Sequence, residues 1–320
     1  MKKVCFLIPH GNVKLSSLSG AIEIFEIVND YLTDHTVPKP YQIRIASAGG
    51  ERGFYDSKLF IDINNLKYQN PDLIIIPGMF LNKSENESRE LANWVVKQYG
   101  KGCEIASLCT GSFFLASTGL LDGLECSTHW KSEYEFRLRY PQVNLCTDKI
   151  FTDYKGLYTS GGAHSSLNLI LYLIEKYDGR EIALACSKIL QIDLQRSSQS
   201  QFILFEGLKN HDDDLIRKVQ LYVEKNFDKG LSVENLADKF NMSKRNFIRR
   251  FKKVTYTTPI DYIHKVKIET AKRKLENNNT SINEVMYSIG YNDAKAFRSI
   301  FRKITGLSPT EYKQKFSMEN

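Results

Sequence analysis

The residues best suited to covalent chemistry surround Cys109. The run from Ala106 to Ser112 passes from an apolar strand pattern directly into a helical one, which continues through residues 113–116. A cysteine on such a strand-turn-helix elbow sits at the end of a strand, and the amino-terminus of a helix favours its thiolate form. The pattern predicts either a nucleophile or a binding cleft at Cys109.

A nucleophile needs a base, and the sequence places none beside Cys109. Thr110 follows the cysteine, so the usual activation pair of a hydrolase is missing. His10 and His129 lie in other loops, and the sequence leaves open whether they approach. We therefore favour a cleft without catalysis over a cysteine hydrolase or amidase. A redox sensor at Cys109 is a third interpretation, because oxidation also requires a reactive thiolate.

The segments that must position this elbow alternate between strand and helix patterns. The continuous apolar runs are typical of strands buried in a parallel sheet. Expected strands cover residues 4–8, 42–47, 71–78 and 102–108, with a further strand ending at Trp130, and expected helices cover residues 20–31, 87–99 and 165–176. The fold class is therefore predicted to be α/β, with a parallel sheet covered by helices on both faces.

Ligands of such sheets bind at the carboxyl ends of the strands, where the loop at residues 10–14 and the elbow should meet. An anion such as a carboxylate suits the elbow, and Trp130 offers an aromatic face to a cation. Alternatively, Trp130 packs in the core or an interface and His129 is a hydrogen-bonded structural residue. We expect no metal and no cofactor. The expected effector-binding residues are His10, Gly78, Met79, Cys109, Thr110, Thr128, His129 and Trp130.

The last third of the chain contains one pattern written twice, at an offset of 50 positions. Phe247 corresponds to Phe297, and Tyr262 corresponds to Tyr312. A repeat at fixed spacing indicates one supersecondary unit used twice. Each copy predicts a capped helix, a short turn and a second helix, and a long helix at residues 259–277 joins the copies.

The second helix of each copy presents polar and basic residues opposite its buried phenylalanines. From Ser243 to Lys253 there are six basic residues and no acidic one, which suits phosphates and guanine edges. The joining helix, about 25 Å long, suits two recognition helices about 34 Å apart, one turn of DNA. The expected DNA-binding residues are Ser243, Lys244, Arg245, Asn246, Arg249 and Lys252 in the first copy and Asn292, Lys295, Ala296, Ser299 and Arg302 in the second.

The charge distribution agrees with this assignment. Residues 212–320 hold 22 Lys and Arg against 14 Asp and Glu, a net charge of +8, whereas the whole chain carries +7. A near-neutral body with a basic terminal domain indicates a nucleic-acid partner rather than a membrane. No secretory signal or span-length apolar run is evident, and the six cysteines form no C-x-x-C pair, so we expect reduced thiols in the cytoplasm.

Two family resemblances follow from these motifs. Residues 231–316, closing with G-L-S-P-T-E-Y at residues 306–312, resemble the DNA-binding domain of AraC/XylS-type regulators. The motifs L-C-T-G-S-F-F-L-A, G-L-L-D-G, T-H-W and T-S-G-G resemble the ThiJ/PfpI branch of the class I glutamine amidotransferase superfamily. That resemblance implies a flavodoxin-like fold and, in this regulator group, sensing of small amino-acid-like or quaternary-amine compounds.

The resemblance also shows where this chain departs from the enzymes. In the enzymatic relatives a histidine follows the cysteine, and an acidic residue from the first helix region contacts the thiol. Thr110 and Ser17 occupy these two positions here.

The resulting prediction is a DNA-binding transcription regulator rather than an enzyme. Residues 1–200 form the sensor domain, residues 201–213 the linker, and residues 214–320 the DNA-binding domain. Its expected partners are double-stranded operator DNA, a small effector, a second copy of the chain in a homodimer, and RNA polymerase. A ligand-blind architectural DNA binder is the remaining alternative.

Overall fold

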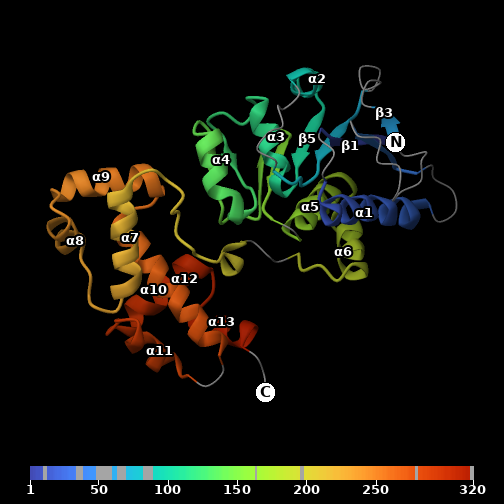
Figure 1. The fold of residues 1–320 in the computed structure, drawn as a ribbon. Coiled ribbons are helices and arrows are strands. Elements are labelled where there is room, and N and C mark those ends of the chain that lie inside the picture. Colours follow the sequence, from blue (N-terminus) through green and yellow to red (C-terminus); the bar gives the residue numbers. More distant parts are fainter. Residues whose placement is uncertain are drawn as a thin grey trace. The chain divides into compact units, whose positions relative to one another are not determined.

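The chain forms two compact units, Met1–Gln199 and Ser200–Asn320 (Figure 1). The computed structural model describes residues 1–9, 13–33, 39–47, 60–62, 70–81, 89–162, 164–194, 198–277 and 280–317. Within these ranges, no helix combines the length and apolarity needed to cross a bilayer. All six cysteines are free thiols.

The N-terminal unit is built on one large sheet, in the strand order β3-β2-β1-β4-β5-β9-β8. Neighbouring strands run parallel except β8 and β9, which are antiparallel. This confirms the predicted parallel sheet and adds one antiparallel edge. The strands of the sheet are β1 (Lys2–Ile8), β2 (Tyr41–Ser47), β3 (Phe60–Asp62), β4 (Leu73–Ile76), β5 (Glu104–Ser107), β8 (Phe151–Tyr154) and β9 (Leu157–Ser160).

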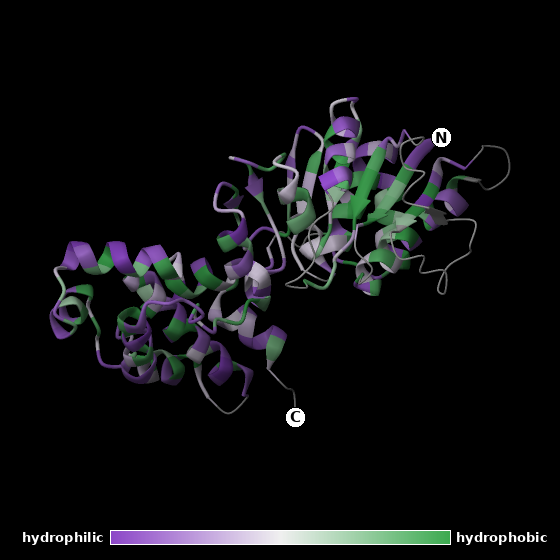
Figure 2. Ribbon diagram, turned by 45° about the horizontal axis from the view of Figure 1, so that its top comes forward, coloured by the Kyte–Doolittle hydropathy of each residue, from purple (hydrophilic) through white to green (hydrophobic). Residues whose placement is uncertain are grey.

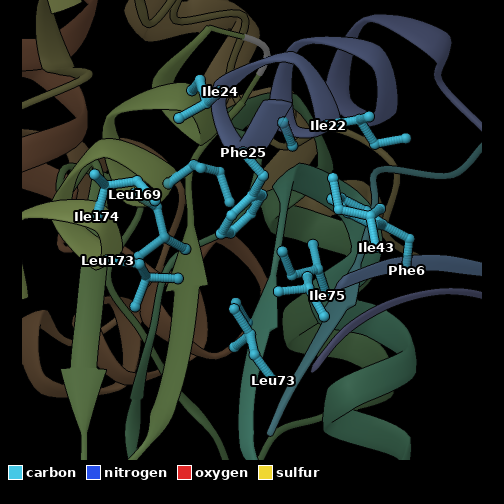
Figure 3. Packing of buried hydrophobic residues seen from close by; sticks show 14 of the residues in the cluster. Phe6, Ile22, Ile24, Phe25, Ile43, Leu73, Ile75, Leu169, Leu173 and Ile174 are labelled. Atoms are coloured by element: carbon cyan, nitrogen blue, oxygen red, sulfur yellow. The ribbon is translucent and has the colours of Figure 1, made fainter. Parts of the chain in front are cut away.

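Helices cover both faces of the sheet. Val4 and Phe6 of β1 pack in one apolar cluster, while Cys5 and Leu7 pack in another, as the period of two in a strand requires. Figure 3 shows Phe25 and Leu169 meeting the sheet in the first cluster. The first cluster includes α1 (Leu15–Thr33), α5 (Ser165–Asp178) and α6 (Arg180–Ile189), and the second includes α2 (Arg89–Tyr99), α3 (Ser112–Ser117) and α4 (Glu133–Arg139).

Two predicted boundaries near the candidate site were wrong. Helix α1 begins at Leu15, five positions before the predicted start, because Leu18 adds a buried turn that its polar neighbours conceal. The strand expected to reach Trp130 is only β6 (Glu125–Cys126), which pairs with β7 (Asn144–Leu145). Trp130 instead begins a short 3-10 helix.

The C-terminal unit is helical and has two apolar cores. Helix α10 contributes Tyr262 and Val266 to the first core and Ile268 and Leu275 to the second, so it joins the two copies. Figure 2 shows hydrophilic and hydrophobic residues alternating along the helices of this unit. The helices are α7 (Asp214–Asn226), α8 (Val233–Lys239), α9 (Lys244–Thr255), α10 (Pro259–Glu276), α11 (Ile282–Ser288), α12 (Ala294–Thr305) and α13 (Pro309–Phe316).

The two copies agree in their packing as well as in sequence. The rings of Phe251 and Tyr262 lie 5.3 Å apart at 81°, and those of Phe301 and Tyr312 lie 5.5 Å apart at 78°. Aromatic side chains prefer this edge-to-face arrangement, and both copies adopt it. The sequence repeat therefore corresponds to a repeated helix-turn-helix structure.

Candidate effector site and nucleic-acid interface

Cys109 lies at the predicted elbow, at the carboxyl edge of the sheet. Its backbone has a φ of 54°, an uncommon conformation for a residue other than glycine. The Cys109 N–H donates to Ser160 Oγ on β9 at 3.3 Å, which ties the elbow to a neighbouring strand. The side chain is 1% exposed. The elbow is therefore a fixed, buried turn between β5 and α3.

A lysine is the polar neighbour of the Cys109 thiol in the described part of the chain. Lys14 Nζ lies 3.8 Å from Cys109 Sγ. Ser17, which the family resemblance aligns with the acid of the enzymes, accepts from the Gly78 N–H and donates to the Lys14 carbonyl. Among the described residues no carboxylate or imidazole bonds to the thiol; His10 lies outside them. This arrangement offers a cation to a ligand rather than a base to a nucleophile.

Two predicted effector-binding hydroxyls serve the framework of the site. Thr110 Oγ1 accepts from the Met79 N–H at 2.9 Å and donates to the Met79 carbonyl. Thr128 Oγ1 donates to the Cys109 carbonyl at 3.1 Å and accepts from Ser112 Oγ at 2.8 Å. Both threonines are buried. They hold the strand ends together, so their hydroxyls are already engaged.

The half-buried side chain of His129 contributes a donor to this edge. Its Nδ1 accepts from the Lys131 N–H at 3.1 Å, which leaves the ring proton on Nε2. Burial, and then the charges of Lys14 and Lys131, lower the pKa of His129 from its ordinary value. The imidazole is thus neutral near pH 7. Its ring centroid lies 5.5 Å from that of Trp130.

Lys14 and Phe80 are candidate site residues that the sequence did not single out. Lys14 Nζ lies 5.8 Å from the centre of the Phe80 ring, which is 59% exposed. The available signal was a cation in the loop after the first strand, the place where α/β sheets bind ligands. Among the described residues, no group of three or more His, Cys, Asp or Glu could hold a metal ion.

The predicted DNA-contacting residues lie on the second helix of each copy or just before its start. Ser243 caps α9 by accepting from the Asn246 N–H, and Asp293 caps α12 by accepting from the Lys295 N–H. The predicted residues of both helices are exposed, except for the half-buried Ala296. Phe247 and Phe297 point into the two cores, as predicted.

The cations of α9 differ in their partners. Lys244 pairs with Glu234, and Arg249 donates to Asn246 Oδ1 at 3.1 Å. Arg250 is bound to Asp213 through two hydrogen bonds of 2.6 and 2.9 Å. Among the described residues, Arg245 has no ion-pair partner. Arg245 is therefore the arginine of this helix most available to a ligand, because Arg249 and Arg250 both donate to side chains.

Comparisons with known proteins agree with this two-part organisation. Residues 2–176 match the model of the DJ-1/PfpI family, and residues 236–315 match that of a helix-turn-helix domain. The HTH-type transcriptional regulator GbdR of Pseudomonas aeruginosa is 27% identical over 243 residues, covering 76% of this chain and 65% of GbdR. ArgR of the same species, also named an HTH-type transcriptional regulator, is 27% identical over 211 residues, covering 66% of this chain and 64% of ArgR.

A solved structure shows the same fold. The crystal structure of a putative transcriptional regulator protein from Vibrio parahaemolyticus has a TM-score of 0.51 at 19% identity, covering 59% of this chain and 98% of that chain. The sequence alignments above span less than two thirds of the length of the two curated relatives.

Proposed function

Because the chain belongs to the DJ-1/PfpI family and carries an AraC-type helix-turn-helix domain, we propose that it is a transcription regulator without catalytic activity. It binds double-stranded DNA through the C-terminal unit and a small effector through the N-terminal unit. The observation that carries this proposal is the pair of exposed polar helices, α9 and α12, joined by α10. The names of GbdR and ArgR support the regulatory role.

DNA binding uses both copies of the repeat. Helix α9 brings Arg245, Arg249 and Lys252 to one segment of the major groove, and Ser243, Lys244 and Asn246 lie beside them. Helix α12 brings Lys295 and Arg302 to the next segment, together with Asn292, Ala296 and Ser299. Arginine forks read guanine edges, whereas lysines and hydroxyl groups contact phosphates. Arg245 is the residue that we assign to base readout, because among the described residues its guanidinium has neither an ion pair nor a hydrogen bond, whereas Arg249 and Arg250 both donate to side chains.

The first prediction tests this assignment with Arg245→Ala. We expect a loss of about 1–3 kcal/mol, or roughly 5- to 150-fold, in affinity for a duplex selected from a random pool. Binding to unrelated duplex should change little at the same salt concentration, because phosphate contacts dominate it. Lys218→Ala is the control, since it removes one exposed charge of the same unit from α7. Equal losses on both duplexes would make Arg245 a phosphate contact.

The effector site lies at the elbow and takes a small compound with an anionic group. Lys14 supplies the charge, 3.8 Å from the Cys109 thiol, and His129 supplies its Nε2–H. Trp130 and Phe80 offer aromatic faces to the remainder of the compound. Gly78, Met79, Thr110 and Thr128 form the supporting wall. His10 belongs to this proposal on sequence grounds alone.

The second prediction concerns this anion. Both tryptophans, Trp94 and Trp130, lie in the N-terminal unit, so their fluorescence reports its thermal unfolding separately. A panel of small carboxylates, amino acids and betaines should contain compounds that raise this midpoint, whereas polyamines should not. Lys14→Met should abolish the rise, and Lys101→Met, on another part of the unit, should preserve it. An unshifted midpoint with every carboxylate would contradict an anion site.

The assembly and location follow from the same proposal. The regulator acts as a homodimer, the commonest symmetric assembly of soluble proteins, so that two DNA-binding units meet one operator. Bound DNA places it beside RNA polymerase at a promoter. A regulator of bacterial type acts where the chromosome lies, which places this chain in the cytoplasm. The sensor, linker and DNA-binding domains have the boundaries 1–200, 201–213 and 214–320.

A further inference from the structure

The side chain of Gln199 is buried in the wall of the elbow site. Its Nε2 donates to the Thr128 carbonyl at 3.0 Å and to the Lys149 carbonyl at 3.3 Å, and its Oε1 accepts from the Gly162 N–H at 3.2 Å. Gln199 is 2% exposed. A Cβ at Gly161 would lie 2.6 Å from the Gln199 amide, so a glycine there makes room for it. The amide is thus held by bonds at both of its ends.

The partners of this amide are also neighbours of the candidate effector residues. Thr128, whose carbonyl receives Gln199, donates its own hydroxyl to the Cys109 carbonyl at 3.1 Å. Gly162 lies against the His129 ring, because a Cβ there would meet the ring at 2.2 Å. If the elbow moves, Thr128 carries the change to the hydrogen bonds of Gln199. If His129 moves, Gly162 carries the change to the same bonds.

Gln199 is also the last residue of the N-terminal unit, and the chain that follows is bound to the C-terminal unit. Lys272 Nζ of α10 donates to the Ile203 carbonyl at 2.5 Å, and the Phe205 N–H donates to Glu269 Oε2 at 3.1 Å. Lys272 and Glu269 are themselves paired at 2.8 Å and buried. The segment after Gln199 is therefore fastened to the helix that both copies share.

The far end of the segment is bound to the first recognition helix. Asp213 forms two hydrogen bonds with Arg250 of α9 and also caps α7 by accepting from the Ile216 N–H. Arg250 is next to Arg249, one of the proposed DNA contacts. A movement of Asp213 would therefore displace α9, the helix that carries those contacts.

We propose that residues 199–213, here called the coupling segment, transmit effector binding to α9, with Gln199 as the positioning residue at its sensor end. This inference rests on the proposed function, since it presumes an effector at the elbow and DNA on α9. An effector that moves Thr128 or Gly162 breaks or shortens the bonds of the Gln199 amide. The altered position of Gln199 shifts the start of the segment, and the Asp213–Arg250 pair passes that shift to α9. Such coupling requires that the effector favour one of two positions of the segment.

The test uses the full chain, a duplex selected from a random pool, and Thr128→Val as a defined disturbance of the elbow. Thr128→Val removes the hydroxyl that bonds to the Cys109 carbonyl but keeps the side-chain shape. We expect it to change the Kd for the selected duplex at least about fivefold, the lower end of common allosteric couplings. In the Gln199→Met background the same substitution should change the Kd by less than about twofold. Ser198→Ala, which loses a bond to the Asp148 carbonyl beside the segment, should preserve the full response.

A second measurement does not depend on how well Gln199→Met folds. In the Thr128→Val protein, hydrogen exchange should be faster at the amides of Gly162 and Phe205, which bond to Gln199 and Glu269. Unchanged exchange at Phe205 would overturn the coupling segment. Gln199→Glu, which keeps the acceptor for Gly162 but loses both donors, should repeat the Gln199→Met result.

The outcomes separate this inference from the proposed function. An equal effect of Thr128→Val in both backgrounds would overturn the role of Gln199 and leave DNA binding and elbow sensing in place. A Kd that is unchanged by Thr128→Val in the otherwise native chain would overturn the coupling segment, while the carboxylate panel tests effector binding at the elbow separately. If the native chain selected no duplex from the random pool, the proposed function as a sequence-specific DNA-binding regulator would be overturned.

Discussion

Replacing Lys272 with methionine is expected to destabilise the C-terminal unit by about 3–5 kcal/mol. The side chains of Lys272 and Glu269 are 4% and 8% exposed, and their charged atoms lie 2.8 Å apart. Removing the ammonium leaves the buried Glu269 carboxylate with only the exposed Arg273 as a neighbouring cation among the described residues, and leaves the Ile203 carbonyl without its donor. Urea unfolding followed by circular dichroism at 222 nm should show the loss, while tryptophan fluorescence of the N-terminal unit keeps its midpoint.

Two further variants separate burial from charge. Arg273→Met removes a neighbouring cation whose side chain is 70% exposed, 3.7 Å from Glu269 Oε1, and should cost less than about 1 kcal/mol. The double variant Lys272→Met/Glu269→Gln removes both charges and keeps an acceptor for the Phe205 N–H, so it should recover much of the loss. If Lys272→Met lowered the free energy of unfolding no more than Arg273→Met does, the buried ion pair would stabilise the unit no more than an exposed one.

The helix-turn-helix repeat could be predicted because its signals are local. Phenylalanines at a spacing of four mark the buried side of α9 and α12, and a capping side chain marks the start of each helix. Ser232, Ser243 and Ser281 all cap their helices. The repeat at a fixed offset then predicted that both copies form the same helix-turn-helix unit, since similar sequences fold alike.

The burial of two lysines of α10 could not be predicted from the local sequence pattern. Lys267 and Lys272 have the same residue type as the exposed cations around them, yet both are buried. Lys267 Nζ donates to the Gly290 carbonyl at 3.2 Å and lies 4.8 Å from the centre of the Tyr291 ring. The carbonyls that accept from these two lysines, those of Gly290 and Ile203, are distant in sequence, so periodicity on α10 alone cannot identify them.

The elbow site was predictable in outline and not in its bonding. A strand-turn-helix motif placed Cys109 correctly, because that motif is contiguous. The engagement of Thr110 and Thr128 with the framework depends on loops from other strands. Gln199 belongs to no motif, and only its bonds to Thr128 and Gly162 reveal its place.

Gly111→Ala is expected to destabilise the N-terminal unit by about 3 kcal/mol or more, the upper end of overpacking costs. The φ of Gly111 is −60°, so conformation does not demand a glycine here. Lack of space requires a glycine, because a Cβ would lie 2.4 Å from the Ile76 carbonyl oxygen and 2.7 Å from that of Pro77. Both atoms are backbone at the end of β4 and cannot rotate away, so the elbow must separate from that strand. Urea unfolding followed by tryptophan fluorescence measures the cost in this unit alone.

Gly100→Ala is the matched control, since it adds the same methyl group in the same unit. Its Cβ would meet the nearest atoms at 3.5 and 3.6 Å, which is ordinary contact. Stability should therefore stay within about 1 kcal/mol of the native value. Because Cys109 is two residues before Gly111, separation of the elbow from β4 should also remove any stabilisation by carboxylates. The Gly111→Ala protein could instead unfold at the same urea concentration as the native protein and still be stabilised by carboxylates. That result would show that close contact with β4 does not hold Cys109 in place.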